Sequence, residues 1–550
     1  MRKLFAATVV AEMIGGPSAY ADEPKTPSAI WTITKAEWTA ADEKGFGDFV
    51  RAIGHSNCSN TVECLRSPAN PYRDSDPKSL KFVADCADFP YMLRAYYAWK
   101  NGLPFGYVNG VNGKGSDIRF YGGGNRPSSR RDLVDHGGGL NAVQLLQEIH
   151  AGVSTATYRT NPGFETGVLS DFYSPKIQPG TIRPGTSIYD TNGHVGVIYD
   201  IEPDGRIDYM DSHPDLSVTR STYGAQFGQS PARLGGGLKN WRPMKLAGAH
   251  EVNGKLIGGH IELTPNSQIP DFSMEQYTGN VPGAKGDGDD ARFQYQGVEL
   301  GMYEYVRVAI SGGSPFYNPV YELRSSMRTL CNDIKDRALS VDLAIKDGIN
   351  KKPQPRNLPD NIYTAGNPEW EGYATPSRDA RLKAAFAQLY IDLEKMVFMY
   401  NNRDPRIVYD GVFLKQDLEK IYKEEAAACS ISYTNSRGQS VTLGFDDVAQ
   451  RLFRLDFDPY HCIERRWGAT GEEAASCTDD ETKNRWYKAE QRLRNSADRD
   501  YTSHMGFDVA QLEKISTVAG TERPPTTDVK GLIEHIGERV AFVGMKPVGR

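Results

Sequence analysis

PGTSIYDTNGHVGVIYDIEPDGRIDYMDSHPD, residues Pro184–Asp215, has the pattern of a β-hairpin. Apolar residues alternate with polar ones on both sides of Asp204-Gly205, a typical tight-turn dipeptide. Pairing across that turn brings the residues around Asp211 back beside His194, near the start of the first strand. The segment therefore predicts an antiparallel sheet that places a histidine close to an aspartate.

A second segment, KFVADCADFPYMLRAYYAWKNGLPF at residues 81–105, has the apolar spacing of a helix. Cys86 lies at the start of this spacing, and the Gly-Leu-Pro triplet at 102–104 ends it. A thiol at a helix N-terminus faces the positive end of the helix dipole, which favours the thiolate and lowers the pKa. We therefore expect Cys86 to open a helix as a nucleophile. Asp85 either assists the helix N-terminus or is a solvated surface acid.

The cysteine count indicates the same residue. The chain has 7 cysteines, an odd number, and an oxidising compartment favours their pairing. Proximity along the chain predicts the pairs Cys58–Cys64 and Cys462–Cys477, and Cys331 and Cys429 then form a long-range pair. Other connectivities are open to six cysteines. With this pairing, Cys86 is the unpaired thiol.

The N-terminus has the order of a secretory signal peptide. Arg2 and Lys3 precede an apolar run, and a small-residue Ala-Tyr-Ala site ends at Ala21. Glu12 interrupts the run, so an amphipathic N-terminal helix is the alternative. We expect cleavage after Ala21 and a periplasmic or secreted protein. No later stretch approaches the ~18 apolar residues that cross a membrane, so no membrane span is expected.

Length and charge limit the number of domains and the kinds of partner that the protein can have. The chain has 550 residues, and 64 Lys+Arg against 70 Asp+Glu give a formal net charge of −6. Without a basic block, it has neither the electrostatic footprint of a nucleic-acid-binding protein nor a polybasic patch for anionic lipids. At about 100–200 residues per domain, this length predicts two or more domains.

Changes in sequence pattern divide the chain into four regions. Residues 1–21 form the signal peptide, and residues 22–245 mix strand-like runs, helical patches and glycine-rich segments, which is typical of an α+β domain. Residues 246–293 include a Pro/Gly/Asp-rich stretch that predicts a linker or long loop. Residues 294–550 show helical apolar spacing and predict a mainly α-helical accessory domain, with a protein as its possible partner.

The hairpin segment resembles the papain-like peptidoglycan hydrolases of the NlpC and CHAP type. In that family a Pro-Gly motif precedes a Gly-His-Val strand, and an acidic residue follows on the next strand. The residues of this chain at those places are Pro184-Gly185, Gly193-His194-Val195 and Asp211. The resemblance covers about residues 80–215 and implies a papain-like domain ahead of the helical one.

The segment around Cys86 is also similar to transglutaminase-like proteins, which share the papain-like core and the Cys-His-Asp order. Their motif has an acidic-aromatic pair after the cysteine, matched here by Asp88-Phe89, and a Gly-Leu-Pro triplet matched at 102–104. This likeness implies an acyltransferase, or a cysteine peptidase directed at proteins, as the alternative activity.

Both likenesses imply acyl transfer through a covalent thioester. His194 deprotonates Cys86, the thiolate attacks a carbonyl carbon, and Asp211 holds the imidazole in the required tautomer. The implied substrate is the peptide part of peptidoglycan, and the reaction needs no cofactor. Structural roles are the alternatives: a buried thiol for Cys86, a core or turn histidine for His194 and a strand-end acid for Asp211.

Other residues near these motifs are candidates for substrate binding. His213 follows Asp211 by two positions and belongs either to the cleft wall or to a loop. The insertion at 120–140 combines glycine runs with Arg126 and Arg130. It is either a lid whose arginines clamp substrate carboxylates or a solvated surface loop.

No metal site is expected from the spacing of the ligand-type residues. The remaining histidines do not follow a metal-binding pattern, and the Asp-Gly-Asp-Asp run at 287–290 lacks the spacing of a calcium loop. A third class of function also stays open, a non-catalytic module whose helical half binds a partner.

Overall fold

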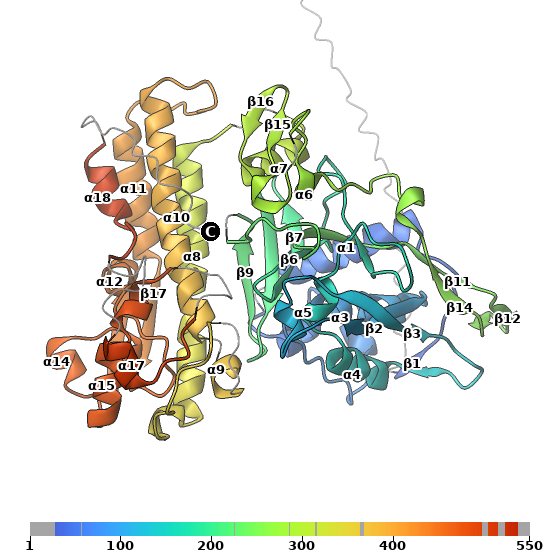
Figure 1. Ribbon diagram of the computed structural model, residues 1–550, viewed down its shortest axis with the longest axis horizontal. Helices are drawn as coiled ribbons and strands as arrows, with labels where there is room; N and C mark the ends of the chain where they lie inside the picture. The colour runs from blue at the N-terminus through green and yellow to red at the C-terminus, as the bar shows by residue number, and fades with distance from the viewer. Residues whose placement is uncertain are drawn as a thin grey trace, which may run out of the picture.

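The structure, a computed structural model, describes residues 28–536 except 57, 225, 285, 314–315, 363–367, 374, 498–503 and 515–522. The expected signal peptide at 1–21 lies outside the described residues. Helices and strands are both abundant, which confirms the α+β class. The chain folds into two halves with separate apolar cores, one built around an antiparallel sheet and the other mainly helical (Figure 1).

The predicted hairpin is confirmed and lies within a six-stranded antiparallel sheet. The strand order is β5-β10-β6-β7-β8-β9. The bounds are β5 Phe172–Tyr173, β6 Ser187–Asp190, β7 His194–Ile201, β8 Ile207–Ser212, β9 Val218–Thr222 and β10 Gly237–Trp241. Val197 pairs with Met210 across the hairpin, and Asp211 pairs with Thr219 of the edge strand β9. This register decides which side chains meet at the start of β7.

Two helices cover one face of this sheet. α1 (Ala40–Gly54) begins with a capping box, in which the Thr39 and Asp42 side chains each accept the other residue's backbone N–H. α3 (Phe89–Asn101) carries a proline in its first turn and ends at Gly102, whose φ of 65° is left-handed. The apolar faces of both helices share one core with inward residues of β7 and β8.

A long hairpin and several short elements complete this part of the first half. β2 (Phe105–Asn112) pairs with β3 (Arg126–Leu133) in an antiparallel ladder with a bulge. The insertion at 120–140, expected to be a loop, therefore contains a full strand. The shorter elements are β1 Ile30–Trp31, α2 Thr61–Arg66, β4 Leu140–Asn141, α4 Ala142–Gly152 and α5 Thr155–Tyr158.

The region at 246–293 differs from the expected linker because most of it packs on the first half. β11 (Met244–Ala247) pairs with β14 (His260–Leu263), and a small hairpin protrudes between them (Figure 1). Gln276 is buried and exchanges hydrogen bonds with the backbone of β10. The further elements are β12 His250–Val252, β13 Lys255–Ile257, α6 Glu275–Thr278, β15 Phe293–Tyr295 and β16 Val298–Leu300.

α7 (Met302–Ser311) also belongs to the first half. Its Val306 and Ile310 share a core with Ile198 and Tyr209 on the second face of the sheet. The sheet is therefore covered on both faces, and the core of the second half begins near Tyr317 rather than at residue 294.

The second half is mainly helical, as its apolar spacing predicts. Three long helices, α8, α10 and α11, pack together, with α8 in contact with both of the others (Figure 1). The elements are α8 Pro319–Lys346, α9 Pro368–Gly372, α10 Thr375–Asn401, α11 Leu414–Ala427, β17 Ser430–Thr434, β18 Ser440–Gly444, α12 Phe445–Arg451, α13 Ile463–Arg466, α14 Gly471–Ala474, α15 Glu481–Ala489, α16 Gln491–Asn495, α17 Val509–Lys514 and α18 Val529–Glu534.

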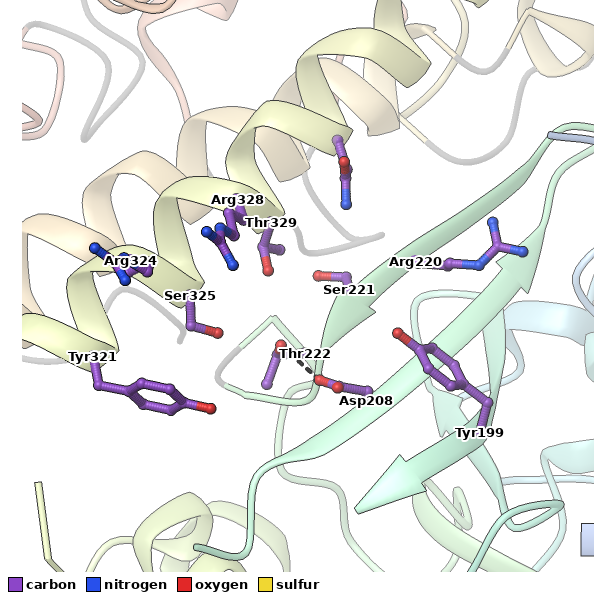
Figure 2. A pocket seen from close by; sticks show the side chains of 11 residues that line it. Tyr199, Asp208, Arg220, Ser221, Thr222, Tyr321, Arg324, Ser325, Arg328 and Thr329 are labelled. Carbon is purple, nitrogen blue, oxygen red and sulfur yellow. Dashed lines mark hydrogen bonds between the residues drawn. The ribbon is translucent and has the colours of Figure 1, made fainter. Parts of the chain in front are cut away.

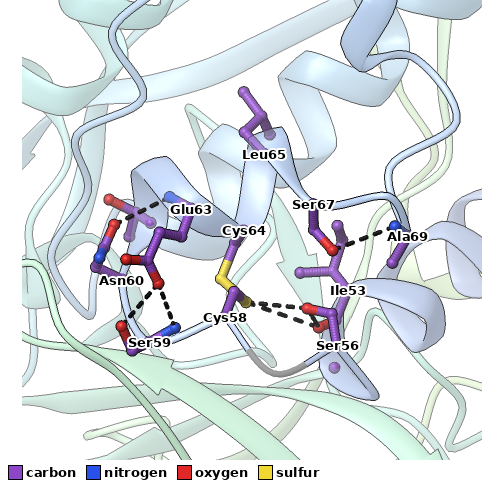
Figure 3. The surroundings of a disulfide bond; sticks show 12 residues. Ile53, Ser56, Cys58, Ser59, Asn60, Glu63, Cys64, Leu65, Ser67 and Ala69 are labelled. Carbon is purple, nitrogen blue, oxygen red and sulfur yellow. Dashed lines mark hydrogen bonds between the residues drawn. A yellow bond between two sulfur atoms is a disulfide. The ribbon is translucent and has the colours of Figure 1, made fainter.

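The predicted disulfide pairing is confirmed. The bonds are Cys58–Cys64, Cys331–Cys429 and Cys462–Cys477, and Cys86 is the free cysteine. Figure 3 shows the first bond, which ties the chain after α1 to α2, beside the capping residue Asn60. Three disulfides are compatible with an exported protein. Within the described ranges, every helix is too short or too polar to cross a bilayer.

The two halves meet along the edge of the sheet, where α8 lies beside β9 (Figure 1). The contacts are polar. The Arg378 guanidinium lies 3.3 Å from a carboxylate oxygen of Asp215, and the Ser340 hydroxyl donates to the same oxygen at 2.8 Å. The helical half therefore covers the end of β8 that carries Asp211.

Candidate active site

His194 and Asp211 come together through the register of the hairpin. His194 is the first residue of β7, and Asp211 is the fifth residue of β8. The His194 Nε2 and an Asp211 carboxylate oxygen form a hydrogen bond. Both residues are buried, with 9% and 1% of their surface exposed. The structure thus brings together two of the three residues predicted to be catalytic.

Asp211 has two further partners that hold its carboxylate in place. The Thr219 hydroxyl, from the paired position on β9, donates to one oxygen. Arg381 of α10 donates to the other oxygen at 3.1 Å. Although burial alone raises it, the pKa of Asp211 is held well below its usual range by His213, His194 and Arg381. Asp211 is therefore ionised at neutral pH.

His194 is neutral at the same pH. Burial, followed by the positive charge of Arg381, lowers the pKa of His194, and the neighbouring Asp211 opposes this change. An ionised carboxylate only accepts hydrogen bonds, so the proton shared with Asp211 belongs to Nε2 of His194. The lone pair of the imidazole is then on Nδ1, the ring nitrogen nearer the main chain. His194 has the protonation state of a general base.

His213 lies behind this pair and not on an open cleft wall. Its ring stacks on His194, with 5.4 Å between the ring centroids and an interplanar angle of 16°. Its Nε2 is 3.1 Å from the Thr219 hydroxyl and 3.8 Å from an Asp211 oxygen. Burial, and then the charge of Arg378, lowers the pKa of His213 well below its usual value. The structure therefore gives His213 contacts that position His194 and Asp211.

Cys86 lies in the turn just before α3, which begins at Phe89, so the residue does not open the helix itself. Its Sγ is 3.9 Å from the carbonyl oxygen of Gly193, and the Val195 N–H is hydrogen-bonded to the sulfur. The thiol therefore lies against the backbone on both sides of His194. Within the described residues, no hydrogen bond joins Cys86 to the imidazole of His194. Cys86 therefore lies beside His194 without a hydrogen bond between the two side chains.

Gly193 allows this close approach of the two segments. Its φ of 88° is in the left-handed region, and a Cβ added there lies 3.0 Å from the Phe120 ring. A larger residue at this position meets both strain and a steric contact. Gly193 is thus needed for the turn between β6 and β7 that leads into His194.

The protonation of Cys86 differs from the expectation. Desolvation of the sulfur, and next the negative charge of Asp85, raises the pKa of the Cys86 thiol well above its usual value. The opposing hydrogen bond from Val195 is smaller. The helix dipole therefore does not determine the pKa of Cys86. The sulfur is poorly hydrated, and three nearby carboxylates, those of Asp85, Asp88 and Asp211, disfavour the thiolate. Cys86 is a neutral thiol at rest.

Asp85 and Asp88 organise the turn that carries Cys86. Asp85 accepts the Ala87 N–H at 2.8 Å, and Asp88 accepts the Asp85 N–H at 2.6 Å. Asp88 also pairs with Nδ1 of His150 from α4. That hydrogen bond raises the pKa of His150, while burial raises the pKa of Asp88 to about 7. Asp85 thus contributes to the loop conformation and disfavours the thiolate.

The two arginines proposed to bind substrate have other contacts. Arg126 lies over the Phe164 ring, 4.1 Å from its centroid. Arg130 pairs with the buried Asp171, which also accepts the Tyr91 hydroxyl at 2.8 Å. Among the described residues, neither arginine contacts Cys86, His194 or Asp211. The structure therefore gives Arg130 a structural partner, and the clamp on substrate carboxylates stays a prediction.

Thr219, His150 and Arg381 were not identified from the sequence. Thr219 could have been found by extending the alternation of the hairpin to the next strand, because it faces Asp211 directly. His150 and Arg381 carry no local signal, since Arg381 lies 170 residues from Asp211 along the chain. Only the packing of the two halves brings it to the site.

Three described clusters have side-chain ligand atoms within 4.8 Å of one another. One is His194, Asp211 and His213, whose donor types suit a divalent cation. Arg381 already supplies positive charge to Asp211, so a cation must compete with it. A second cluster is Asp456, His461 and Glu490 in the helical half, where Arg494 lies 3.6 Å from Asp456 and 3.8 Å from Glu490. The third includes disulfide-bonded sulfurs of Cys462 and Cys477.

Comparison with known proteins assigns the chain to no family. No family model matches the chain, and no curated protein or solved structure matches it. The resemblance to papain-like hydrolases therefore remains a prediction based on the Cys86 and His194 segments.

Proposed function

We propose that the protein is an exported cysteine hydrolase, an amidase or endopeptidase that cleaves the peptide part of peptidoglycan. Cys86 is the nucleophile, His194 the general base and Asp211 the residue that orients the imidazole. The observation that carries this proposal is the neutral His194, fixed through Nε2 by an ionised carboxylate, beside the free cysteine of the chain. The substrate class comes from the resemblance to the NlpC and CHAP enzymes.

The proposed reaction has two steps at one carbonyl carbon. His194 takes the thiol proton on Nδ1 as the sulfur of Cys86 bonds to the carbon, and the C–N bond then breaks as His194 returns the proton to the leaving amine. Water next loses a proton to His194 and attacks the thioester, which releases a carboxylic acid and restores the thiol. Because the resting pKa of Cys86 is raised, proton transfer accompanies the attack of the sulfur on the carbonyl carbon instead of preceding it.

Purified cell-wall sacculi offer the direct test of this function. The mature protein is incubated with sacculi under reducing conditions, which keep Cys86 reduced, and the released muropeptides are identified by mass spectrometry. We expect release by the wild type and a loss of at least about 100-fold in Cys86→Ala and in His194→Ala. The mass of the fragments identifies the bond that is cut. Equal release by Cys86→Ala contradicts the proposal.

A specific observation favours a second candidate, the non-catalytic module. The Cys86 sulfur faces the Gly193 carbonyl and its pKa is raised, both of which suit a structural thiol. Under this alternative, sacculi and protein substrates stay intact, and Cys86→Ala leaves partner binding unchanged. Cleavage of a protein, or incorporation of an amine into one, while sacculi stay intact supports the transglutaminase-like alternative.

A further inference from the structure

A cavity of about 180 Å³ lies between the edge of the central sheet and the first half of α8 (Figure 2). One wall comes from β7, β8 and β9, and the other from α8. At about 30 Å³ per water molecule, the cavity holds about six waters. This is room for one small polar ring and too little for an extended peptide. The described hydrolytic residues are not part of its lining.

Hydroxyl groups dominate the walls of this cavity. Figure 2 shows the hydroxyls of Tyr199 and Ser221 pointing into it from the sheet, and those of Ser325 and Thr329 from α8. Among the described residues, the side chains of Tyr199, Ser325, Thr329 and Asn332 make no hydrogen bond to another group of the protein. Each of these groups can both donate and accept. The cavity therefore offers several unused hydrogen-bonding groups to a ligand.

The charges around the cavity disfavour an anion. Arg220 donates to three backbone carbonyls near the end of α1, which engage its guanidinium. Arg324 and Arg328 both pair with Glu425, at 3.3 Å and 3.0 Å. The wall also contains the carboxyl of Asp208, which accepts the Thr222 hydroxyl at 3.1 Å. An anionic ligand therefore meets the carboxyl of Asp208, and the three guanidinium groups around it already donate to backbone carbonyls or pair with glutamates.

A cation is also a poor fit. Asp208 is the lone acidic side chain in the described lining, and three arginines surround it. A neutral ligand with several hydroxyl groups matches both the charge balance and the excess of hydroxyls. The hydroxyls of such a ligand can donate hydrogen bonds to Asp208 and accept them from Asn332. The serine and threonine side chains can both donate to the ligand and accept from it.

We propose that this cavity binds one uncharged sugar ring of a saccharide chain. β8 and β9, which contribute Asp208 and Ser221 to the cavity, also carry Asp211 and Thr219 of the candidate active site. A bound sugar therefore lies on the same two strands as Asp211 and Thr219. Where the substrate is peptidoglycan, the cavity holds the glycan while the attached peptide reaches Cys86. Sugar binding itself does not depend on that reaction.

Binding is tested with the full mature protein and a tetramer of N-acetylglucosamine, by isothermal titration calorimetry. A glucose tetramer and inorganic phosphate are the comparison ligands. We expect saturable binding of the N-acetylglucosamine tetramer and none of phosphate. Ser325→Leu, which fills the cavity from an α-helix that accepts leucine well, weakens binding at least about tenfold. Asp208→Ala weakens it as well, because the acceptor for the sugar hydroxyls is lost.

Lys335→Leu is the matched control, because Lys335 is an exposed residue of the same helix outside the cavity. It binds the sugar like the wild type, and so does Cys86→Ala. If Cys86→Ala still binds the sugar but releases no muropeptides, sugar binding is shown to be independent of hydrolysis, so the two proposals are tested separately. The sugar proposal is overturned if neither tetramer binds, if phosphate binds instead, or if Ser325→Leu and Asp208→Ala both bind as the wild type does.

Discussion

Asp211 is the residue on which the candidate site depends, because its two oxygens are shared by His194, Thr219 and Arg381. These contacts fix the carboxylate in one orientation, and its charge keeps the proton of His194 on Nε2. The nitrogen left to act as a base is Nδ1, and the Cys86 sulfur lies against the neighbouring backbone, 3.9 Å from the Gly193 carbonyl oxygen. An uncharged amide at position 211 can reverse this tautomer, since its NH₂ group donates.

Asp211→Asn therefore removes hydrolysis while leaving Cys86 in place. We expect muropeptide release to fall by about 10²–10⁴-fold, as the loss of an oriented general base implies. Initial release rates measure the effect, and far-ultraviolet circular dichroism checks the fold. Asp200→Asn on β7 is the matched control, since Asp200 pairs with Arg51 and His55 and stays partly exposed. A similar loss in both variants argues against the assigned role.

Cys86 has a raised pKa, so its alkylation depends on pH in a defined direction. Desolvation and Asp85 disfavour the thiolate, and iodoacetamide reacts with the thiolate form. We expect slow labelling near pH 7 and a rate that rises about tenfold per pH unit up to pH values above 9. Asp85→Asn removes a negative charge and accelerates labelling at neutral pH. Peptide mass mapping measures this rate, and fast labelling of the wild type near pH 7 contradicts the described environment.

Elements with a local pattern were predicted best. The β7–β8 hairpin and the helix after Cys86 follow from residue alternation, apolar spacing and turn dipeptides. Two disulfides follow from proximity along the chain, and the third joins the two cysteines that remain once Cys86 is left unpaired. The start of α3 was misplaced because Asp85 and Asp88 bond the backbone of the turn at 86–88, which delays the helix to Phe89. Local spacing does not report such side-chain competition.

Elements whose place depends on tertiary contacts were predicted less well. The polar region at 246–293 was expected to be a linker, yet its short strands and α6 pack on the sheet. The contribution of α10 to the site has no sequence signal, because Arg381 meets Asp211 only after both halves have folded. The sequence alone therefore predicted that His194 and Asp211 meet, but it did not predict that Arg381 contacts Asp211.

Arg381→Gln tests the contribution of α10. Arg381 lowers the pKa of His194, second to burial, so the neutral side chain lets that pKa rise. His194 must be neutral to act as a base, and the acid limb of the activity–pH profile therefore moves to higher pH. We expect a severalfold loss of release near about pH 6 and a smaller loss near pH 8. Arg378→Gln, one turn away and paired with Asp215, is the control. An unmoved acid limb in Arg381→Gln contradicts the coupling.

The two halves of the molecule are joined across a polar interface that contains two partly buried acids, Asp333 and Asp336. Asp333 and Asp336 of α8 lie with His213, Arg378 and Arg381 around a small cavity of about 20 Å³. Burial, then Asp336, raises the pKa of Asp333 to about 8. Burial also raises the pKa of Asp336 to about 7, against the opposing charge of Arg378. Polar interfaces of this kind allow relative motion of domains.

This interface predicts how stability depends on pH. A carboxyl whose pKa is higher in the folded than in the unfolded protein binds more protons when folded, so stability falls as pH rises from about 4 to the folded values near 7 and 8. His194 and His213, whose pKa values are lowered, act in the opposite direction, so the double variant Asp333→Asn, Asp336→Asn is the reference. We expect the thermal midpoint of the wild type to drop by at least about 3 °C relative to that of the double variant between pH 5 and pH 8.5. Calorimetry measures both midpoints, and a wild-type midpoint that rises relative to the double variant over this range contradicts the assignment.

The central claim is that Cys86 forms a thioester with the substrate, and product partitioning tests it most directly. Sacculi are incubated with the protein in the presence of hydroxylamine, and the new fragment ends are read by mass spectrometry. A thioester on Cys86 is intercepted, so we predict fragments that end in a hydroxamate with the wild type and none with Cys86→Ala. Fragments that end only in a carboxylate, hydroxamates that persist in Cys86→Ala, or no cleavage at all contradict the account.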